Sequence, residues 1–366
     1  MKLERITNKQ GCFLTLLFFS SNCYSLLFAA KYGASVWFCY LIASLISIAV
    51  VFLINTLMKY AENRTFFEFL DFLLPCPFGR MITALLMLYA FLSTCTSLSI
   101  FGQFNQLTAL SKTPTIIIPL AVILLGVWAC RSGIQTIGRM ASLTILFAVA
   151  VFLLFSLLAL DGLNPDLLRI PKENESGSFL RGGLIVFCNQ LGDIILLTVL
   201  YPHFARRSTR GRATMLGVVF AGGILFIISI ITVMTLGGSG ISGDAYPVFT
   251  VLSVRTIGGF IQHLELASSV AMTLFAFFRV SLSLYFITQA FRHLFSLDDG
   301  RAPILPIGLL LASMTQLLYH GMPMLMVRLE SNLSLWILLS IQIICPFLLF
   351  VLALIKTKKI KTLGCK

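Results

Sequence analysis

Residues 35–58 read SVWFCYLIASLISIAVVFLINTLM and contain no charged side chain. A helix of about 20 such residues crosses the hydrocarbon core of a bilayer, because it satisfies its own backbone hydrogen bonds there. The rest of the chain has the same character: 58% of its 366 residues are hydrophobic, 11% are charged, and the mean hydropathy is +0.96. A soluble domain carries far more charge. The sequence therefore predicts an integral membrane protein built from α-helices.

Apolar blocks of this kind follow one another along the chain, and each predicts a transmembrane helix. The first block follows a basic start, and we expect it to be a retained helix rather than a cleaved signal peptide. Together the blocks predict a single all-α membrane domain covering residues 1–366. The ten blocks cover residues 11–30, 35–58, 81–101, 115–129, 137–160, 183–204, 213–236, 264–291, 304–318 and 333–355.

The formal net charge of +13 has a simple explanation in membrane topology. With the N-terminus in the cytoplasm, 19 of the 27 Lys and Arg residues fall in inner segments and 7 in outer segments, with Arg279 inside a span. Basic residues concentrate on the cytoplasmic side of membrane proteins. We therefore expect both termini to be cytoplasmic. This distribution along alternate loops also argues against a nucleic-acid partner.

Residue types that hold metals or carry out catalysis are scattered along the chain. The nine cysteines form no CxxC pair, and most of them lie inside apolar blocks, where they are expected to pack as small hydrophobes. The four histidines lack the spacing of metal ligands. The sequence also lacks a recognisable nucleophile–base pair or phosphate loop. We expect no cofactor and no metal, and an enzyme is the least expected class.

The longer polar segments occupy equivalent places in the two halves of the chain. Residues 65–72 (TFFEFLDF) form an amphipathic stretch after the second block, and YPVF at 246–249 leads into another after the seventh. Both predict helices that lie on the membrane surface. They follow blocks that are five apart and therefore lie on opposite faces, as two inverted repeats of five helices require. We expect the repeats at about 11–160 and 183–355, joined by an extracytoplasmic linker at 161–182.

The first helix of each predicted repeat carries a polar interruption, which in such repeats leaves backbone groups free to hold a ligand. Polar groups in hydrocarbon are costly unless they face partners or a water-filled cavity. The first interruption is the weaker signal, because Ser and Asn in membrane helices often only pack helices together. The candidate ligand-binding residues are Ser20, Ser21 and Asn22 in the first repeat and Asn189, Gln190, Gly192 and Asp193 in the second.

Two charges of opposite sign, Asp193 and Arg279, lie deep within predicted spans. An unpaired charge at the centre of a bilayer costs at least about 2.5 kcal/mol, so pairing or hydration is expected. One interpretation is a fixed ion pair that locks the sixth span to the eighth. The other places Arg279 beside a transport path, with Asp193 contacting a ligand amine or exchanging a proton. The residues alone leave both interpretations open.

Several short motifs follow one another in a specific order over nearly the whole chain. They are RSGI at 131–134, IGR at 137–139, GDII at 192–195, YP at 201–202 and 246–247, FRVSL at 278–282 and LPIG at 305–308. In their order and spacing the chain resembles the spore germination permeases. These are the B subunits of bacterial nutrient germinant receptors, within the amino-acid/polyamine/organocation superfamily.

The resemblance implies a LeuT-like fold in the spore inner membrane and a complex with an A and a C subunit that senses a small nutrient. It also implies an acidic residue at the position of Asp193 and a basic one at that of Arg279, as this chain has. Family members usually carry a glycine and then a proline in the first helix, near Phe18 and Ser25, and both are absent here. The bulky Phe18 is expected to narrow a pocket at that place.

Three functions are compatible with these observations. The first is a germinant sensor, in which a nutrient such as an amino acid shifts the balance between two helix arrangements. The second is a secondary transporter of amino acids or amines. The third is a structural membrane subunit without a ligand.

Overall fold

The computed structural model describes most of the chain, and nearly all of the described residues are helical. One isolated bridge joins Ile6 and Phe204. The described residues are 5–21, 23, 28–61, 64–75, 77–108, 112–114, 116–168, 176–206, 209–244, 246–253, 264–298, 300–318 and 329–363.

The helical elements alternate between long α-helices and short irregular segments. The α-helices are α1 (Asn8–Phe19), α2 (Val36–Tyr60), α3 (Phe66–Leu73), α4 (Phe78–Thr108), α5 (Ile117–Ser132), α6 (Ile134–Ala159), α7 (Ser176–Val186), α8 (Arg210–Gly243), α9 (Pro247–Ser253), α10 (Leu264–Phe295), α11 (Ile304–Leu318), α13 (Asn332–Leu339) and α14 (Cys345–Leu363). The 3-10 segments are η1 (Ala30–Ser35), η2 (Leu160–Gly162), η3 (Pro165–Leu167) and η6 (Asp193–His203), and the π segments are η5 (Phe187–Leu191) and η8 (Ser340–Ile344).

Seven helical stretches within the described ranges are long and apolar enough to cross a membrane, so the chain is a multi-pass membrane protein. Two further apolar helices, α5 and α11, are shorter and coincide with the predicted blocks at 115–129 and 304–318. The all-helical membrane class is confirmed, whereas the number of ten spans stays a prediction. The seven stretches are Ala30–Tyr60, Phe78–Leu107, Ile134–Leu157, Phe179–His203, Arg210–Gly243, Ser268–Phe295 and Asn332–Lys356.

Helix α1 covers the first part of the predicted block 11–30 and ends before the predicted end of that block. Helix α1 begins at a capping box in which the hydroxyl of Thr7 accepts from the backbone N–H of Gln10, and it ends at Phe19 after 12 residues. Ser20 and Ser21 then form a turn, so α1 stops at the predicted polar interruption. At this length α1 falls short of what a bilayer-crossing helix requires.

The sixth block changes helix type at its own predicted interruption. Helix α7 begins at Ser176, earlier than the predicted start at 183, and passes into the π segment η5. Gly192 separates η5 from the 3-10 segment η6, which begins at Asp193. Such π-bulges commonly mark functional sites, because the changed turn redirects backbone and side-chain groups.

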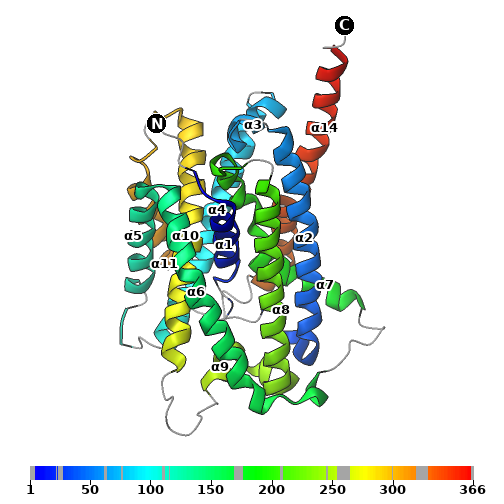
Figure 1. Cartoon of the computed structure of the whole chain (residues 1–366), viewed down its shortest axis with the longest axis vertical. Coiled ribbons are helices and arrows are strands. Elements are labelled where there is room, and N and C mark those ends of the chain that lie inside the picture. The colour runs from blue at the N-terminus through cyan, green and yellow to red at the C-terminus, as the bar shows by residue number, and fades with distance from the viewer. Residues whose placement is uncertain are drawn as a thin grey trace.

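The two short amphipathic stretches are helical and lie at opposite ends of the bundle. Figure 1 shows α3 at the end where the N- and C-termini lie, and α9 at the other end. The α3 helix starts at a capping box formed by Thr65 and Glu68. The helices expected at 65–72 and after Tyr246 are confirmed, and their places fit two repeats of opposite orientation.

Helix α1 lies inside the bundle, packed against α6, α8 and α10 (Figure 1). Its approach to α8 is close: a Cβ atom on Gly217 would lie 2.6 Å from the Cβ of Thr15 and 2.8 Å from the carbonyl oxygen of Cys12. Small residues permit such close backbone contact in membrane proteins. Gly217 of α8 therefore allows α1 to pack closely against α8 on this side.

The segment before α1 is tied to the end of η6. The backbone N–H of Ile6 donates to the carbonyl of His203 at 2.8 Å, and the N–H of Ala205 donates to the carbonyl of Ile6 at 2.9 Å. These bonds form the bridge between Ile6 and Phe204. The start of the described chain and the end of η6 are thus held together by backbone groups.

Candidate functional site

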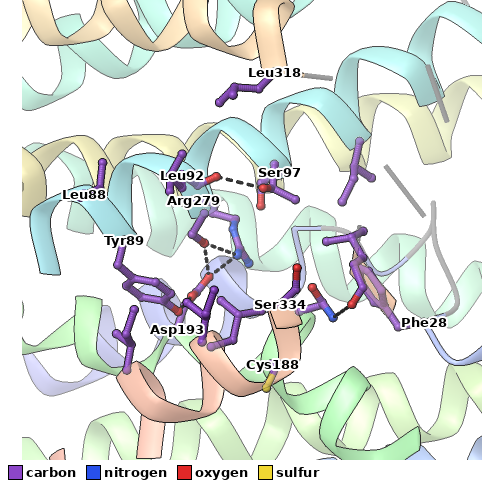
Figure 2. A pocket seen from close by; sticks show the side chains of 18 of the residues that line it. Phe28, Leu88, Tyr89, Leu92, Ser97, Cys188, Asp193, Arg279, Leu318 and Ser334 are labelled. Carbon is purple, nitrogen blue, oxygen red and sulfur yellow. Dashed lines mark hydrogen bonds and ion pairs between the residues drawn. The ribbon is translucent and has the colours of Figure 1, made fainter. Parts of the chain in front are cut away.

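Asp193 and Arg279 form an ion pair in the interior of the bundle. Asp193 is the first residue of η6 and Arg279 lies within α10, and their side chains are only 4% and 2% exposed. Figure 2 shows the two side chains pointing toward each other. The structure therefore brings together the two intramembrane charges that the sequence singled out, and each compensates the other.

Helix α4 supplies further donors to the carboxylate. The hydroxyl of Tyr89 donates to Oδ1 of Asp193, and that of Ser93 donates to Oδ2 at 2.7 Å. Nη2 of Arg279 also approaches the Ser93 oxygen at 3.4 Å. With one charged and two neutral donors, the carboxylate is well stabilised despite its burial.

The guanidinium of Arg279 reaches the end of the broken first helix. Its Nη1 donates to the hydroxyl of Ser21 at 3.2 Å, and its central carbon lies 5.2 Å from the centre of the Phe18 ring. A cation over an aromatic face is attracted by the ring quadrupole. The bulky Phe18 thus packs against the arginine. Nε of Arg279 has no hydrogen-bond partner among the residues that the structure describes.

Two buried amides connect the irregular segments around the ion pair. Nε2 of Gln342, in the π segment η8, donates to the hydroxyl of Tyr89 at 2.7 Å and to the carbonyl of Cys188 at 2.9 Å. Nε2 of Gln190 donates to the carbonyl of Phe19 at 2.9 Å, which links η5 to the end of α1. Both interrupted helices therefore belong to one polar network.

Gly192 provides the space that this network needs. A Cβ atom on Gly192 would lie 2.1 Å from Oε1 and 2.4 Å from Cδ of Gln342, far inside contact distance. A side chain at position 192 would push the Gln342 amide away from Tyr89. Gly192 thus leaves room for the Gln342 amide, and its predicted role in ligand binding stays a prediction.

We expect Gly192→Ala to destabilise the protein by about 1–3 kcal/mol, because overpacking forces buried groups from their places. Thermal unfolding of the purified protein in detergent measures the loss. Gly243→Ala is the control, since a Cβ atom there meets nothing within 4 Å. Truncating Gln342 to Ala in the Gly192→Ala background should recover part of the lost stability. Equal unfolding temperatures for both glycine variants would contradict this packing role.

The remaining predicted site residues have different outcomes. Asn189 lines a cavity and donates from Nδ2 to the carbonyl of Ile185 at 2.9 Å. Ser20 donates to the carbonyl of Leu16 at 3.0 Å within its own helix, so its hydroxyl serves local structure. Asn22 lies outside the described residues. Whether any of these residues binds a ligand stays a prediction.

The ion pair faces a cavity of about 420 Å³ between α4, η5, η6, α10 and α13 (Figure 2). Its polar lining is confined to a few side chains, and most of the lining is apolar. The lining residues are Phe28, Leu85, Leu88, Tyr89, Leu92, Ser93, Thr96, Ser97, Ile100, Cys188, Asn189, Asp193, Arg279, Leu318, Leu329, Ser334, Ile337, Leu338 and Ile341.

Sequence reasoning missed Tyr89, Ser93 and Gln342. A signal existed for two of them: residues 93–97 read STCTS, a run of small polar residues in the middle of an apolar block, and Gln342 is an amide in the last block. Such residues in membrane helices often make interhelical hydrogen bonds. Tyr89 had no comparable signal, because a tyrosine in an apolar block is unremarkable.

Comparison with known proteins identifies the family. A family profile described as "Spore germination protein" matches residues 5–322, most of the chain. The chain belongs to the spore germination permease family. Two relatives come from Bacillus subtilis (strain 168). Spore germination protein KB is 21% identical over 376 aligned positions, covering 98% of this chain and 97% of the relative. Putative spore germination protein YfkT is 24% identical over 287 positions, covering 77% and 76%.

This membership confirms the resemblance of the short motifs. It also identifies the chain as a germination-related membrane protein of a permease family. GDII begins at Gly192, between η5 and η6, and FRVSL carries the arginine of the ion pair. Two of the short motifs therefore lie at the ion pair.

Proposed function

We propose that this protein is the membrane subunit of a spore nutrient germinant receptor, and that it senses a small nutrient such as an amino acid. The observation that carries the proposal is the buried pair of Asp193 and Arg279, which faces a cavity and contacts both interrupted helices. A ligand in the cavity would contact the groups that hold these segments together. Different affinities for two arrangements of the segments would then shift their balance.

The charge of the site favours a ligand without net charge. The carboxylate and the guanidinium neutralise each other, so a net ionic ligand would add an uncompensated charge to a buried region. A zwitterionic amino acid avoids that cost, because its ammonium and carboxylate can approach Asp193 and Arg279 together. The apolar lining suits an apolar side chain better than the many hydroxyls of a sugar.

The architecture that we propose is a LeuT-like arrangement of ten spans in two inverted repeats, with the linker at 161–182 outside. Pairs of contacts support it: α2 packs against α8, α4 against α10 and α5 against α11, so equivalent helices meet. Contacts between non-equivalent helices are also repeated in the two halves. The first span packs against the seventh, as α1 against α8, and the sixth packs against the second, as η5 and η6 against α2. We place the protein in the spore inner membrane, with cytoplasmic termini and with A and C subunits as partners.

The experiment fills the cavity without altering the ion pair. Ser97→Leu adds an apolar side chain to the lining, so we expect the amino-acid dose for half-maximal germination to rise at least about tenfold, a loss of roughly 1.4 kcal/mol in binding. Spores that carry the variant are exposed to a panel of amino acids, sugars and nucleosides, and germination is measured together with the abundance of the protein.

Ser156→Leu is the matched control, because Ser156 lies on α6, outside the cavity lining, and donates to the carbonyl of Phe152 in its own helix. Its dose response should equal that of the native protein. An unchanged dose for Ser97→Leu at normal abundance would reject the cavity as the nutrient site. Uptake of labelled amino acid into vesicles separates a sensor from a secondary transporter. A protein that responds to none of the panel would favour a structural subunit.

A further inference from the structure

The cavity beside the ion pair extends to the outer surface of the bundle. Asp193 and Arg279 are buried at one end, whereas Leu85, Leu88 and Leu92 of α4 are 48%, 57% and 41% exposed. All five residues line the same cavity. On the opposite wall, exposed Ile337 of α13 completes the rim. Among the residues that the structure describes, the cavity is therefore open at the side, between α4 and α13.

This side opening faces hydrocarbon when the protein is in a bilayer. Helix α4 belongs to the candidate span Phe78–Leu107, and α13 begins the candidate span Asn332–Lys356. The exposed leucines lie well inside the first of these spans. Exposed apolar side chains in the middle of a transmembrane helix contact lipid tails. The mouth of the cavity is thus continuous with the lipid-facing surface.

We propose that an acyl chain of a bilayer lipid enters between α4 and α13 and occupies the apolar outer part of this cavity. Water is a poor occupant there, because it needs two to four polar partners and the rim offers side chains such as Leu88, Leu92 and Ile337. Hydrocarbon matches the rim and is present at the mouth in great excess. The polar end, with Tyr89 and Asp193, is left for water or for the nutrient.

The experiment measures the proximity of acyl chains directly. The native protein is placed in vesicles of phosphatidylethanolamine and phosphatidylglycerol that contain phosphatidylcholine with a diazirine in one acyl chain. After irradiation, labelled peptides are identified by mass spectrometry. Cys188 and Asn189 of η5 line the cavity, and Cys188 is buried, so an acyl chain that labels them has entered the cavity. We expect label on these two residues.

Larger side chains at the opening between α4 and α13 test whether the acyl chain enters there. Leu92→Trp and Ile337→Trp should abolish label on Cys188 and Asn189, while Leu146→Trp, on the lipid-facing side of α6, should leave it unchanged. Label on α6 itself serves as the internal standard. If thermal unfolding shows that a tryptophan variant is misfolded, Leu92→Phe replaces it.

Absence of label on Cys188 and Asn189 in the native protein would overturn the proposal, and so would label on them that persists after the side opening is filled. Neither outcome depends on germination. A protein that fails to sense a nutrient can still bind an acyl chain, and the reverse also holds.

Discussion

Asp193→Asn should remove most of the folded protein from the membrane. The substitution keeps the size of the side chain but leaves the guanidinium of Arg279 buried without a negative partner. Breaking a buried ion pair on one side typically costs about 3–5 kcal/mol, a large share of the stability of a protein. We expect a similar loss for Arg279→Gln. Quantitative immunoblots of membranes and thermal unfolding in detergent measure both effects.

The double variant Asp193→Asn with Arg279→Gln separates folding from function. It contains no buried charge at this place, so abundance should return toward the native level, because neutral replacements of a buried pair often cost little. The nutrient response should nevertheless stay lost, since both charged contacts for a ligand are gone. A double variant that germinates at the native dose would reject a ligand-gating role for the pair and would favour a purely structural lock. A double variant as unstable as the single ones would show that the network needs charge.

Gly217→Val should prevent the close packing of α1 against α8. Its Cβ would lie 2.6 Å from the Cβ of Thr15 and 2.8 Å from a backbone oxygen of Cys12, which cannot move like the end of a flexible side chain. Overpacking costs about 1–3 kcal/mol and occasionally more, and contact with backbone belongs at the upper end. We expect a lower unfolding temperature and reduced abundance in the membrane.

The matched control for this prediction lies on the same helix. Gly223 is exposed on α8, and a Cβ atom there meets nothing within 4 Å, so Gly223→Val should leave the unfolding temperature nearly unchanged. The two variants share the loss of a glycine and the gain of a branched side chain within α8. A similar loss of stability in both would assign the effect to helix propensity rather than to the contact with α1.

The membrane class and the two polar interruptions were predictable, because apolar length and misplaced polar groups are properties of sequence alone. The partners of Asp193 were harder to predict. Arg279 was found by its charge, whereas Tyr89 contributes through a hydrogen bond whose existence depends on how α4 packs against η6. The extent of α1 also differed, since the apolar block continues past Phe19 while the backbone turns at Ser20 and Ser21. A hydropathy profile indicates which segments lie in the membrane, but it does not indicate where the helix in such a segment ends.

The role of Gln190 and Gln342 depends on tertiary structure in the same way. An amide within an apolar block indicates a partner without saying which one. The structure assigns the carbonyl of Phe19 to Gln190, and Tyr89 with the carbonyl of Cys188 to Gln342. All three contacts join segments far apart in the chain, and two of them cross from one predicted repeat to the other. Such pairings follow from topology, which short-range sequence patterns do not encode.

The bridge between Ile6 and Phe204 joins two segments of the bundle that are far apart in the chain. It fastens the segment before α1 to the far end of η6, whose first residue is Asp193. Gln190 fastens the opposite end of α1 to η5. Hydrogen bonds therefore connect the two interrupted helices at both ends of α1. Because backbone and side-chain hydrogen bonds join the two helices at both ends, we expect a tilt of one to move the other.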